Sequence, residues 1–206
     1  MDQLLFILFR ILVVLFSVVI HEVSHGVMAN SLGDPTAKKL GRLTLNPIKH
    51  LDIWGSILLP IITYQIGGFI FGYAKPVPYN PYNLRDRKFG PAKVALAGPL
   101  SNIIIALIFG IFLRFLPDLG YFSILSQLFS FIVLLNLVLA IFNLMPIPPL
   151  DGHWLLLTFV PDRFYRFKRF FVQYGLVLFL IFLVFIFPLL FPIIIFLHRL
   201  ITARGL

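Results

Sequence analysis

The chain has 206 residues, of which 60% are hydrophobic and only 12% are charged. Such a composition cannot cover a core with polar surface, so lipid is its expected solvent. The absence of cysteine excludes disulfides and thiolate metal sites. The length fits one domain, and we expect a single integral-membrane domain over 1–206 with its core at 4–160.

Basic residues are concentrated in three segments that are separated by apolar runs. One interpretation of these segments is nucleic-acid binding. The positive-inside rule explains them more simply, because cytoplasmic loops of membrane proteins are rich in lysine and arginine and lie near anionic lipid. We therefore expect no nucleic-acid partner and place all three segments inside. They hold 13 of the 17 basic residues: Lys38, Lys39, Arg42 and Lys49; Lys75, Arg85, Arg87, Lys88 and Lys93; and Arg163, Arg166, Lys168 and Arg169.

The first apolar run predicts a helix from Leu4 to about Ala29, which is long enough to cross a bilayer at ~1.5 Å per residue. No basic region precedes the run and no small-residue cleavage site follows it, so we interpret it as a retained span. Asp34-Pro35 ends the helical pattern. Residues 31–52 then contain GRLTLNP, which carries turn and short-strand signals.

Residues 54–72 are apolar, but both of their flanks are basic. If both flanks lie inside, the segment cannot cross twice, because one helical crossing takes ~20 residues. We therefore expect a re-entrant or interfacial segment, with a conventional full span as the alternative. Residues 73–93 contain Pro76, Pro78 and Pro81, which favour extended backbone over helix.

The second half predicts alternating spans, outward over 94–116 and inward over 122–145, with a turn at 117–120. A short helix at 154–160 precedes a span at 170–187, and Pro188 and Pro192 then separate this span from a short helix at 193–201. The segment 168–204 is thus a helical hairpin or a helix plus a surface segment. The fold class is all-α membrane: a polytopic transmembrane helical bundle with a re-entrant or extended segment between the first helix and the GPLSN helix.

The sequence HEVSH occupies positions 21–25, within the first span. Residues four apart on a helix share a face, so His21 and His25 can present two imidazoles to one metal ion. Glu22 lies beside that face and can act as general base on the attacking water. It is the only glutamate of the chain, and ionisable side chains within spans are costly and usually functional. A hydrogen-bonded polar patch between helices is the structural alternative.

A catalytic zinc ion usually has three protein ligands. Because Glu22 is the only glutamate, the third ligand should be an aspartate or another histidine. Asp151 is the best candidate, since it follows the inward-running span and so lies at the same cytoplasmic end as His21 and His25. Its alternative role is that of a helix N-cap.

Two asparagines in the spans are candidates for contacts to substrate. Asn143 and Asn102 can each donate to a developing oxyanion or hold a substrate backbone. Hydrogen bonding between helices is the alternative for both.

Three motifs together resemble the site-2 protease family of intramembrane zinc metalloproteases, in its short prokaryotic branch: HEVSH at 21–25, AGPLSN at 97–102 and NLMPIPPLDG at 143–152. GRLTLNPIKHLD and GYAKPVPYNP resemble the same branch. The resemblance covers about residues 10–160 and implies a peptidase domain. It also implies that His21, His25 and Asp151 are zinc ligands, that Glu22 is the general base, and that Asn143 contacts the substrate or the oxyanion.

We therefore expect a zinc-dependent intramembrane endopeptidase that binds one Zn²⁺ ion and hydrolyses peptide bonds within or near transmembrane segments. Its substrate is then a transmembrane protein or peptide, in the lipid bilayer of a prokaryotic cell membrane, and its active site lies towards the cytoplasmic side. The alternatives are a membrane metal-binding or transport protein and an inactive homologue that binds helices. The sequence leaves the oligomeric state undecided.

Overall fold

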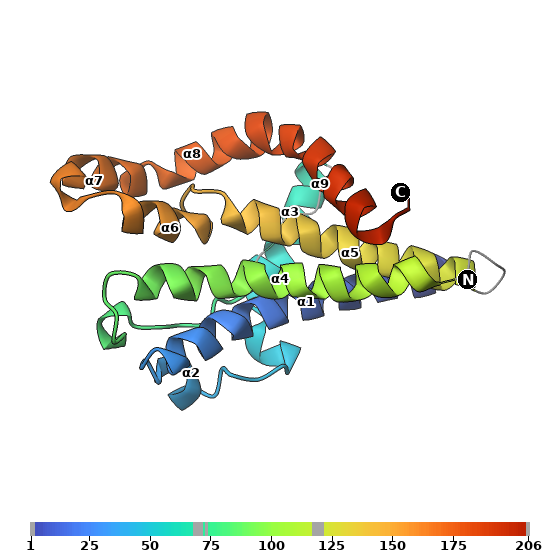
Figure 1. The fold of residues 1–206 in the computed structure, drawn as a ribbon, viewed down its shortest axis with the longest axis horizontal. Coiled ribbons are helices and arrows are strands. Elements are labelled where there is room, and N and C mark those ends of the chain that lie inside the picture. The colour runs from blue at the N-terminus through green and yellow to red at the C-terminus, as the bar shows by residue number, and fades with distance from the viewer. Residues whose placement is uncertain (1–2, 68–71, 73, 117–121, 205–206) are drawn as a thin grey trace. The chain divides into compact units, whose positions relative to one another are not determined.

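Helices account for all the regular secondary structure in the described part of the chain (Figure 1). The structure is a computed structural model, and it describes residues 3–67, 72, 74–116 and 122–204. The chain divides into two compact units, Met1–Arg87 and Lys88–Leu206. The single domain expected from the sequence stays a prediction.

The first unit is built on α1, Gln3–Ser31, a helix of 29 residues. Its remaining elements are short: α2 Thr36–Lys39, η1 Pro47–His50, η2 Ile53–Leu58, α3 Leu59–Gly67 and η3 Pro81–Asn83. Helix α1 ends where Gly33 adopts a φ of +108°, a conformation that glycine tolerates because it has no Cβ. The N–H of Asp34 then donates to the carbonyl of Ala29 at 2.9 Å, which closes the last turn.

Asp34 ties a distant loop to the end of α1. Its carboxylate is fully buried and accepts hydrogen bonds from the N–H of Asn80 at 2.6 Å and from Nδ2 of Asn83 at 2.9 Å. The hydroxyl and N–H of Thr36 donate to it as well. Burial raises the pKa of the Asp34 carboxyl, but these hydrogen bonds to the charged form outweigh burial and hold the pKa below its ordinary value.

No strand forms within residues 31–52, all of which the structure describes, so the short-strand prediction is wrong there. The reason is local capping chemistry. The side chain of Asn46 accepts a hydrogen bond from the N–H of Ile48 at 3.1 Å, and Pro47 occupies the first turn of η1. Proline at that position is preorganised for a helical turn and has no N–H to offer a ladder.

The apolar segment that follows is helical rather than extended. The π-helical turn η2 runs directly into α3, and Asp52 caps the start by accepting from the N–H of Gly55 at 2.8 Å. The two elements have six and nine residues, which gives a length of about 22 Å at 1.5 Å per residue. This length is shorter than the ~30 Å hydrocarbon core of a bilayer. Residues 68–71, at the end of the expected segment, lie outside the described residues.

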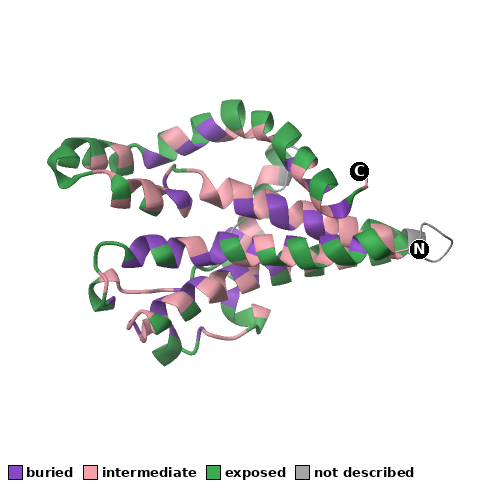
Figure 2. Cartoon of the chain, in the orientation of Figure 1, coloured by how far each residue is buried: buried purple, intermediate pink, exposed green. Residues whose placement is uncertain are grey.

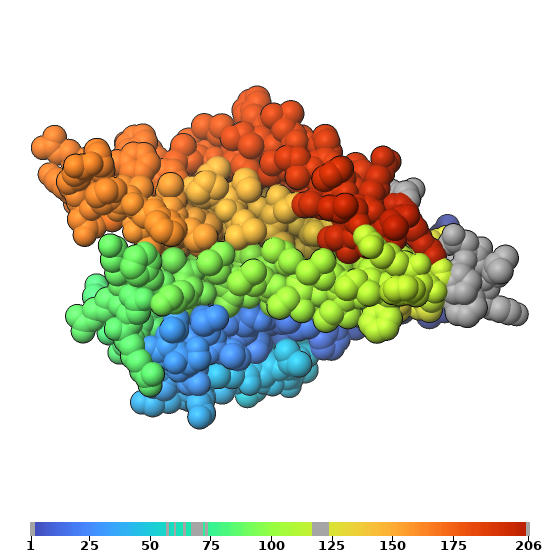
Figure 3. Space-filling view, in the orientation of Figure 1, coloured from blue at the N-terminus to red at the C-terminus, as the bar shows by residue number. Residues whose placement is uncertain are grey.

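The second unit packs three long helices together. Helices α4 (Gly90–Phe115) and α5 (Phe122–Leu144) lie side by side, and α9 (Phe187–Thr202) packs against both. Figure 3 shows the red surface of α9 against the green of α4. The core between them is formed by Ala106, Val133, Leu137 and Ile194. The connecting elements are α6 Gly152–Phe159, η4 Asp162–Phe164, α7 Tyr165–Gln173, α8 Gly175–Ile181 and η5 Phe182–Ile186.

The C-terminal segment forms one continuous helical run, so the expected separate short helix at 193–201 is wrong. Residues Gly175–Thr202 are long and apolar enough to cross a membrane as one helix of 28 residues. Pro188 is the second residue of α9 and lacks the N–H that would continue the helical hydrogen bonds. The residue four before it, Val184, lies in the widened π-helical turn η5, which accommodates the proline ring. Pro192 lies inside α9 without ending it.

Four helices in the described part of the chain are long and apolar enough to cross a membrane: Gln3–Ser31, Gly90–Phe115, Ile124–Leu144 and Gly175–Thr202. At most 39% of the best apolar window of any one of them is buried inside the protein, so most of their apolar surface is left for lipid (Figure 2). Membrane-spanning helices leave apolar residues exposed in this way, because their outward face contacts lipid. The all-α, polytopic fold class expected from the sequence is confirmed.

Candidate metal centre

Two imidazoles converge on the C-terminal half of α1. His21 and His25 lie on successive turns of the helix and are 6% and 8% exposed. Their Nε2 atoms lie 3.0 Å apart, with the rings nearly perpendicular at 87°. Two neutral imidazoles cannot both direct a lone pair at the other without repulsion, so a proton or a cation is needed between the two nitrogens.

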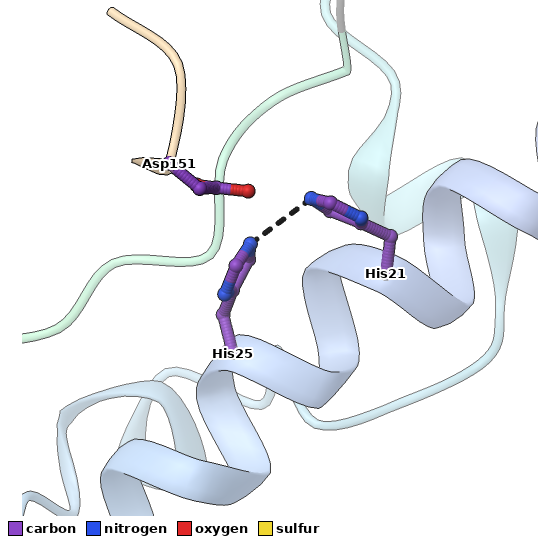
Figure 4. A group of neighbouring side chains, drawn as sticks. All are labelled: His21, His25 and Asp151. Carbon is purple, nitrogen blue, oxygen red and sulfur yellow. Dashed lines mark hydrogen bonds between the residues drawn. The ribbon is translucent and has the colours of Figure 1, made fainter. Parts of the chain in front are cut away.

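Asp151 belongs with His21 and His25 to a group that could hold a metal ion. One ligand atom from each of His21, His25 and Asp151 lies within 4.8 Å of the others, and the group can hold a metal ion (Figure 4). The alternative role as a helix cap is not realised, because Asp151 immediately precedes α6 without making a side-chain hydrogen bond to its N–H groups. The carboxylate is thus not occupied in capping α6.

The donor set fits zinc. Two imidazole nitrogens and one carboxylate oxygen are ordinary ligands of catalytic zinc, with bonds of ~2.0–2.2 Å and a fourth position left open. In a tetrahedral site with such bonds, two nitrogens are ~3.3 Å apart. The observed 3.0 Å between the two Nε2 atoms is within a few tenths of an ångström of that value.

Glu22 is held by the backbone of a segment more than fifty residues away. Its Oε2 atom accepts a hydrogen bond from the N–H of Val77 at 2.8 Å, and the side chain is half-buried. The other carboxylate oxygen accepts no hydrogen bond within the described residues, so it can receive a proton. Glu22 directly follows His21 on α1, and its role as a general base stays a prediction.

The two asparagines have different surroundings. Asn102 is fully buried and its Nδ2 donates to Oδ1 of Asn136 at 2.8 Å, which joins α4 to α5. This geometry favours the helix–helix role for Asn102. Asn143 is half-buried near the end of α5, and its Nδ2 donates to the carbonyl of Leu139 at 3.0 Å. Its Oδ1 makes no hydrogen bond within the described residues, so Asn143 has polar capacity left for a substrate.

His153 and His50 are not part of the metal-binding group. Nδ1 of His153 donates to the carbonyl of Leu150 at 2.6 Å, and burial lowers the pKa of its ring. His50 is fully buried in the first unit and its Nε2 pairs with the carbonyl of Thr44 at 2.8 Å. Both rings therefore have structural hydrogen bonds.

The sequence interpretation missed two buried polar side chains that organise the first unit, Asp34 and Arg42. Asp34 was interpreted only as part of a helix-ending Asp-Pro pair. Arg42 was counted among the basic residues, yet it is only 9% exposed and donates to the carbonyls of Lys75 and Pro76. No signal in the sequence distinguishes this buried arginine from the exposed basic residues near it.

Two features define the class of protein: helices that cross a membrane, and a His-Glu-His pattern on one of them. Together they are those of a membrane metallohydrolase. Residues 9–123 and 120–187 of the chain match the model of the family described as Peptidase family M50. The chain therefore belongs to peptidase family M50, the site-2 protease family, and the resemblance drawn from its motifs is confirmed. The assignment to the zinc metalloproteases, with zinc as the cofactor, is supported by this membership and by the His-His-Asp group.

Several relatives carry names of the same class. "Putative zinc metalloprotease YwhC" of Bacillus subtilis is 41% identical over 180 residues, covering 84% of this chain and 78% of that protein. "Putative zinc metalloprotease Rip2" of Mycolicibacterium smegmatis is 31% identical over 140 residues, covering 68% of this chain and 52% of Rip2. "Putative zinc metalloprotease MJ0611" of Methanocaldococcus jannaschii is 48% identical over 61 residues, covering 29% of this chain and 30% of that protein. No solved structure matches the chain.

Proposed function

We propose that this metalloprotease is an intramembrane endopeptidase that cleaves membrane-protein substrates within or near their transmembrane segments. The observation that carries the proposal is the position of His21, Glu22 and His25 on α1, a helix long and apolar enough to span a bilayer. His25 is six residues from the end of this helix, about 9 Å at 1.5 Å per residue. A peptide bond attacked there must be presented at membrane depth.

In this proposal His21, His25 and Asp151 hold one zinc ion. When bound, zinc supplies Lewis acidity, which polarises the scissile carbonyl and makes water more acidic. Glu22 takes the proton from the attacking water with its available oxygen and passes it to the leaving amine. Asn143 donates to the substrate carbonyl or to the developing oxyanion. A substrate helix has its peptide groups bonded internally, so it must unwind locally before it is attacked.

The test is turnover of a transmembrane model substrate by purified protein in liposomes. Glu22→Gln removes the base but keeps the shape, and we expect a loss of at least about 100-fold in kcat, in line with the usual contribution of general bases. Zinc content, measured on the same preparation, should match that of the wild type. Retained turnover in Glu22→Gln contradicts the role of Glu22. Cleavage confined to the soluble flanks of the substrate contradicts the intramembrane specificity.

We further propose that the site faces the cytoplasmic side of a prokaryotic cell membrane. The basic segments that follow α1, precede α4 and include α7 then all lie inside, in accordance with the positive-inside rule. Because the chain has no cysteine, single cysteines report topology without background. Arg87→Cys and Arg166→Cys should react only with reagents that reach the cytoplasm, and Gln3→Cys and Ala203→Cys only with reagents outside the cell. Labelling of Arg87→Cys from outside contradicts this orientation.

A further inference from the structure

We propose that Arg42 is a positioning residue that acts on Glu22 through a backbone strap, defined here as Lys75–Pro78. The inference rests on the proposed role of Glu22 as general base, and all of its residues belong to the first unit. The contact that matters is the hydrogen bond from the N–H of Val77 to Oε2 of Glu22, 2.8 Å long. The strap has no regular secondary structure of its own, so other contacts must hold that N–H in place.

Arg42 makes the first of these contacts. Its Nη2 donates to the carbonyl of Lys75 at 2.9 Å and to the carbonyl of Pro76 at 3.4 Å. The side chain is only 9% exposed, and its Nε has no hydrogen-bond partner in the described part of the chain. Burial of a guanidinium is costly unless its hydrogens are bonded, so this charge is stable here only because the strap carbonyls accept from it.

The geometry of one peptide group links Arg42 to Glu22. The carbonyl of Pro76 and the N–H of Val77 belong to the same planar peptide unit, in which they point in opposite directions. Arg42 donates to the carbonyl side and Glu22 accepts on the N–H side. A cation at the carbonyl also polarises the peptide and strengthens its N–H as a donor. Arg42 thus both orients the peptide that holds the base and strengthens its bond to the base.

Two further contacts fix the ends of the strap. The N–H of Lys75 donates to the carbonyl of His50 at 2.9 Å. On the other side, Val77 packs on the bare backbone of α1 at Gly26, where an added Cβ would lie 2.7 Å from Cγ1 of Val77. Gly26 directly follows His25, so the strap touches α1 beside a metal ligand.

The same contacts limit a different role for the strap, that of a strand paired with the substrate. An extended segment beside a protease site can add a strand to its substrate through backbone donors and acceptors. Both N–H groups of the strap are already used, by His50 and by Glu22, and Pro76 and Pro78 have none. The strap therefore has no N–H group left to donate to an extended substrate, and the N–H of Val77 serves Glu22 instead.

The first test separates positioning from mere support of the fold. In Arg42→Met we expect kcat to fall about 10-fold or more, since small misplacements of catalytic groups have large effects, while KM and zinc content stay near wild type. Arg42→Lys, which keeps the charge, should recover part of the loss. In a Glu22→Gln background, Arg42→Met should cause no further loss of the residual rate. Additive losses, or a change confined to KM, overturn the proposal.

The second test needs no turnover. Hydrogen exchange of the strap amides reports only Lys75 and Val77, because prolines have no N–H. We expect Arg42→Met and Glu22→Ala each to accelerate exchange at Val77, and Arg42→Lys to have an intermediate effect. Arg42→Lys also replaces Arg42→Met in the test if the Met variant does not accumulate. Arg87→Met, which removes an exposed guanidinium from the same unit, is the matched control and should leave exchange unchanged. Wild-type exchange at Val77 in Arg42→Met overturns the inference, whatever the Glu22→Gln test shows about the function.

Discussion

The Nε2 atoms of His21 and His25 lie 3.0 Å apart, on successive turns of one membrane-spanning helix. Burial makes this proximity informative. In water the two rings would be free to separate, but both are more than nine-tenths buried, and their nitrogens need a shared proton or a cation. A third ligand atom, from Asp151, lies within 4.8 Å of both. The three side chains therefore form a group that could hold a divalent ion.

Removal of the Asp151 carboxylate should release zinc. We expect Asp151→Ala and His25→Ala to lose most of their bound zinc on dialysis against a weak chelator, and to lose turnover with it, because two remaining ligands bind a divalent ion far less tightly than three. Asp162→Ala is the matched control, since Asp162 is an exposed aspartate that forms an ion pair with Lys168. Metal analysis of the purified proteins checks the prediction, and full zinc occupancy in Asp151→Ala would remove Asp151 from the ligand set.

The predictions for this site come from regular features of the sequence, whereas the path of the backbone around it depends on irregular contacts. The spacing of His21 and His25 follows from helical periodicity, and a helix of that length and apolarity could only be a span. The prediction for Asp151 rests on alternating spans, which are expected to bring it to the same side of the membrane as the histidines. Each of these predictions depends on a regular period or on the length of an apolar run compared with the bilayer thickness. Both the period and the length can be read from the sequence.

The remaining features depend on contacts that have no period. The bond from Val77 to Glu22 joins residues 55 positions apart, and the sequence between them gives no register for it. The continuity of the C-terminal helix through Pro188 depends on a π-helical turn. The sequence does not reveal this turn, and proline by itself favours an interrupted helix. Asn102 was interpreted as a site candidate because a polar residue in a span is rare, but that signal cannot distinguish a substrate contact from a bond between helices.

Asn143 and Asn102 should respond differently to the same substitution. In Asn143→Ala we expect kcat to fall about 100-fold with little change in stability, as when one oxyanion donor is removed. In Asn102→Ala we expect near-normal specific activity but a loss of about 1–2 kcal/mol in the free energy of unfolding, because Oδ1 of Asn136 loses its buried donor. Kinetics and SDS denaturation of both variants check this contrast. A large loss of kcat in folded Asn102→Ala would return Asn102 to the site.

Asp34 should make the first unit sensitive to acid. Because the folded pKa of Asp34 lies below its ordinary value of 3.8, the unfolded state binds the proton more tightly, and the stabilisation is fully present above about pH 4. It should be lost as the pH falls from 4 through the lower, folded pKa. Asp34→Asn should cost about 2–4 kcal/mol at pH 7, since four donor groups lose a charged acceptor. Apparent melting temperatures at pH 7, 5, 4 and 3 should converge for the two proteins at low pH, and parallel curves would contradict the assignment.

Gly26→Ala should destabilise the protein although alanine is the better helix former. Helix propensity alone favours alanine over glycine by about 1 kcal/mol. At this position, however, the new Cβ would lie 2.6 Å from Cδ2 of Leu43 and 2.7 Å from Cγ1 of Val77. We expect a net cost of about 1–3 kcal/mol from overpacking, together with a fall in kcat, because displacement of Val77 withdraws the N–H that holds Glu22. The double variant Gly26→Ala, Val77→Ala removes one clashing methyl group and should recover part of both losses, because alanine keeps the backbone donor. If Gly26→Ala is as stable and active as the wild type, the strap does not press on α1 as closely as the structure indicates.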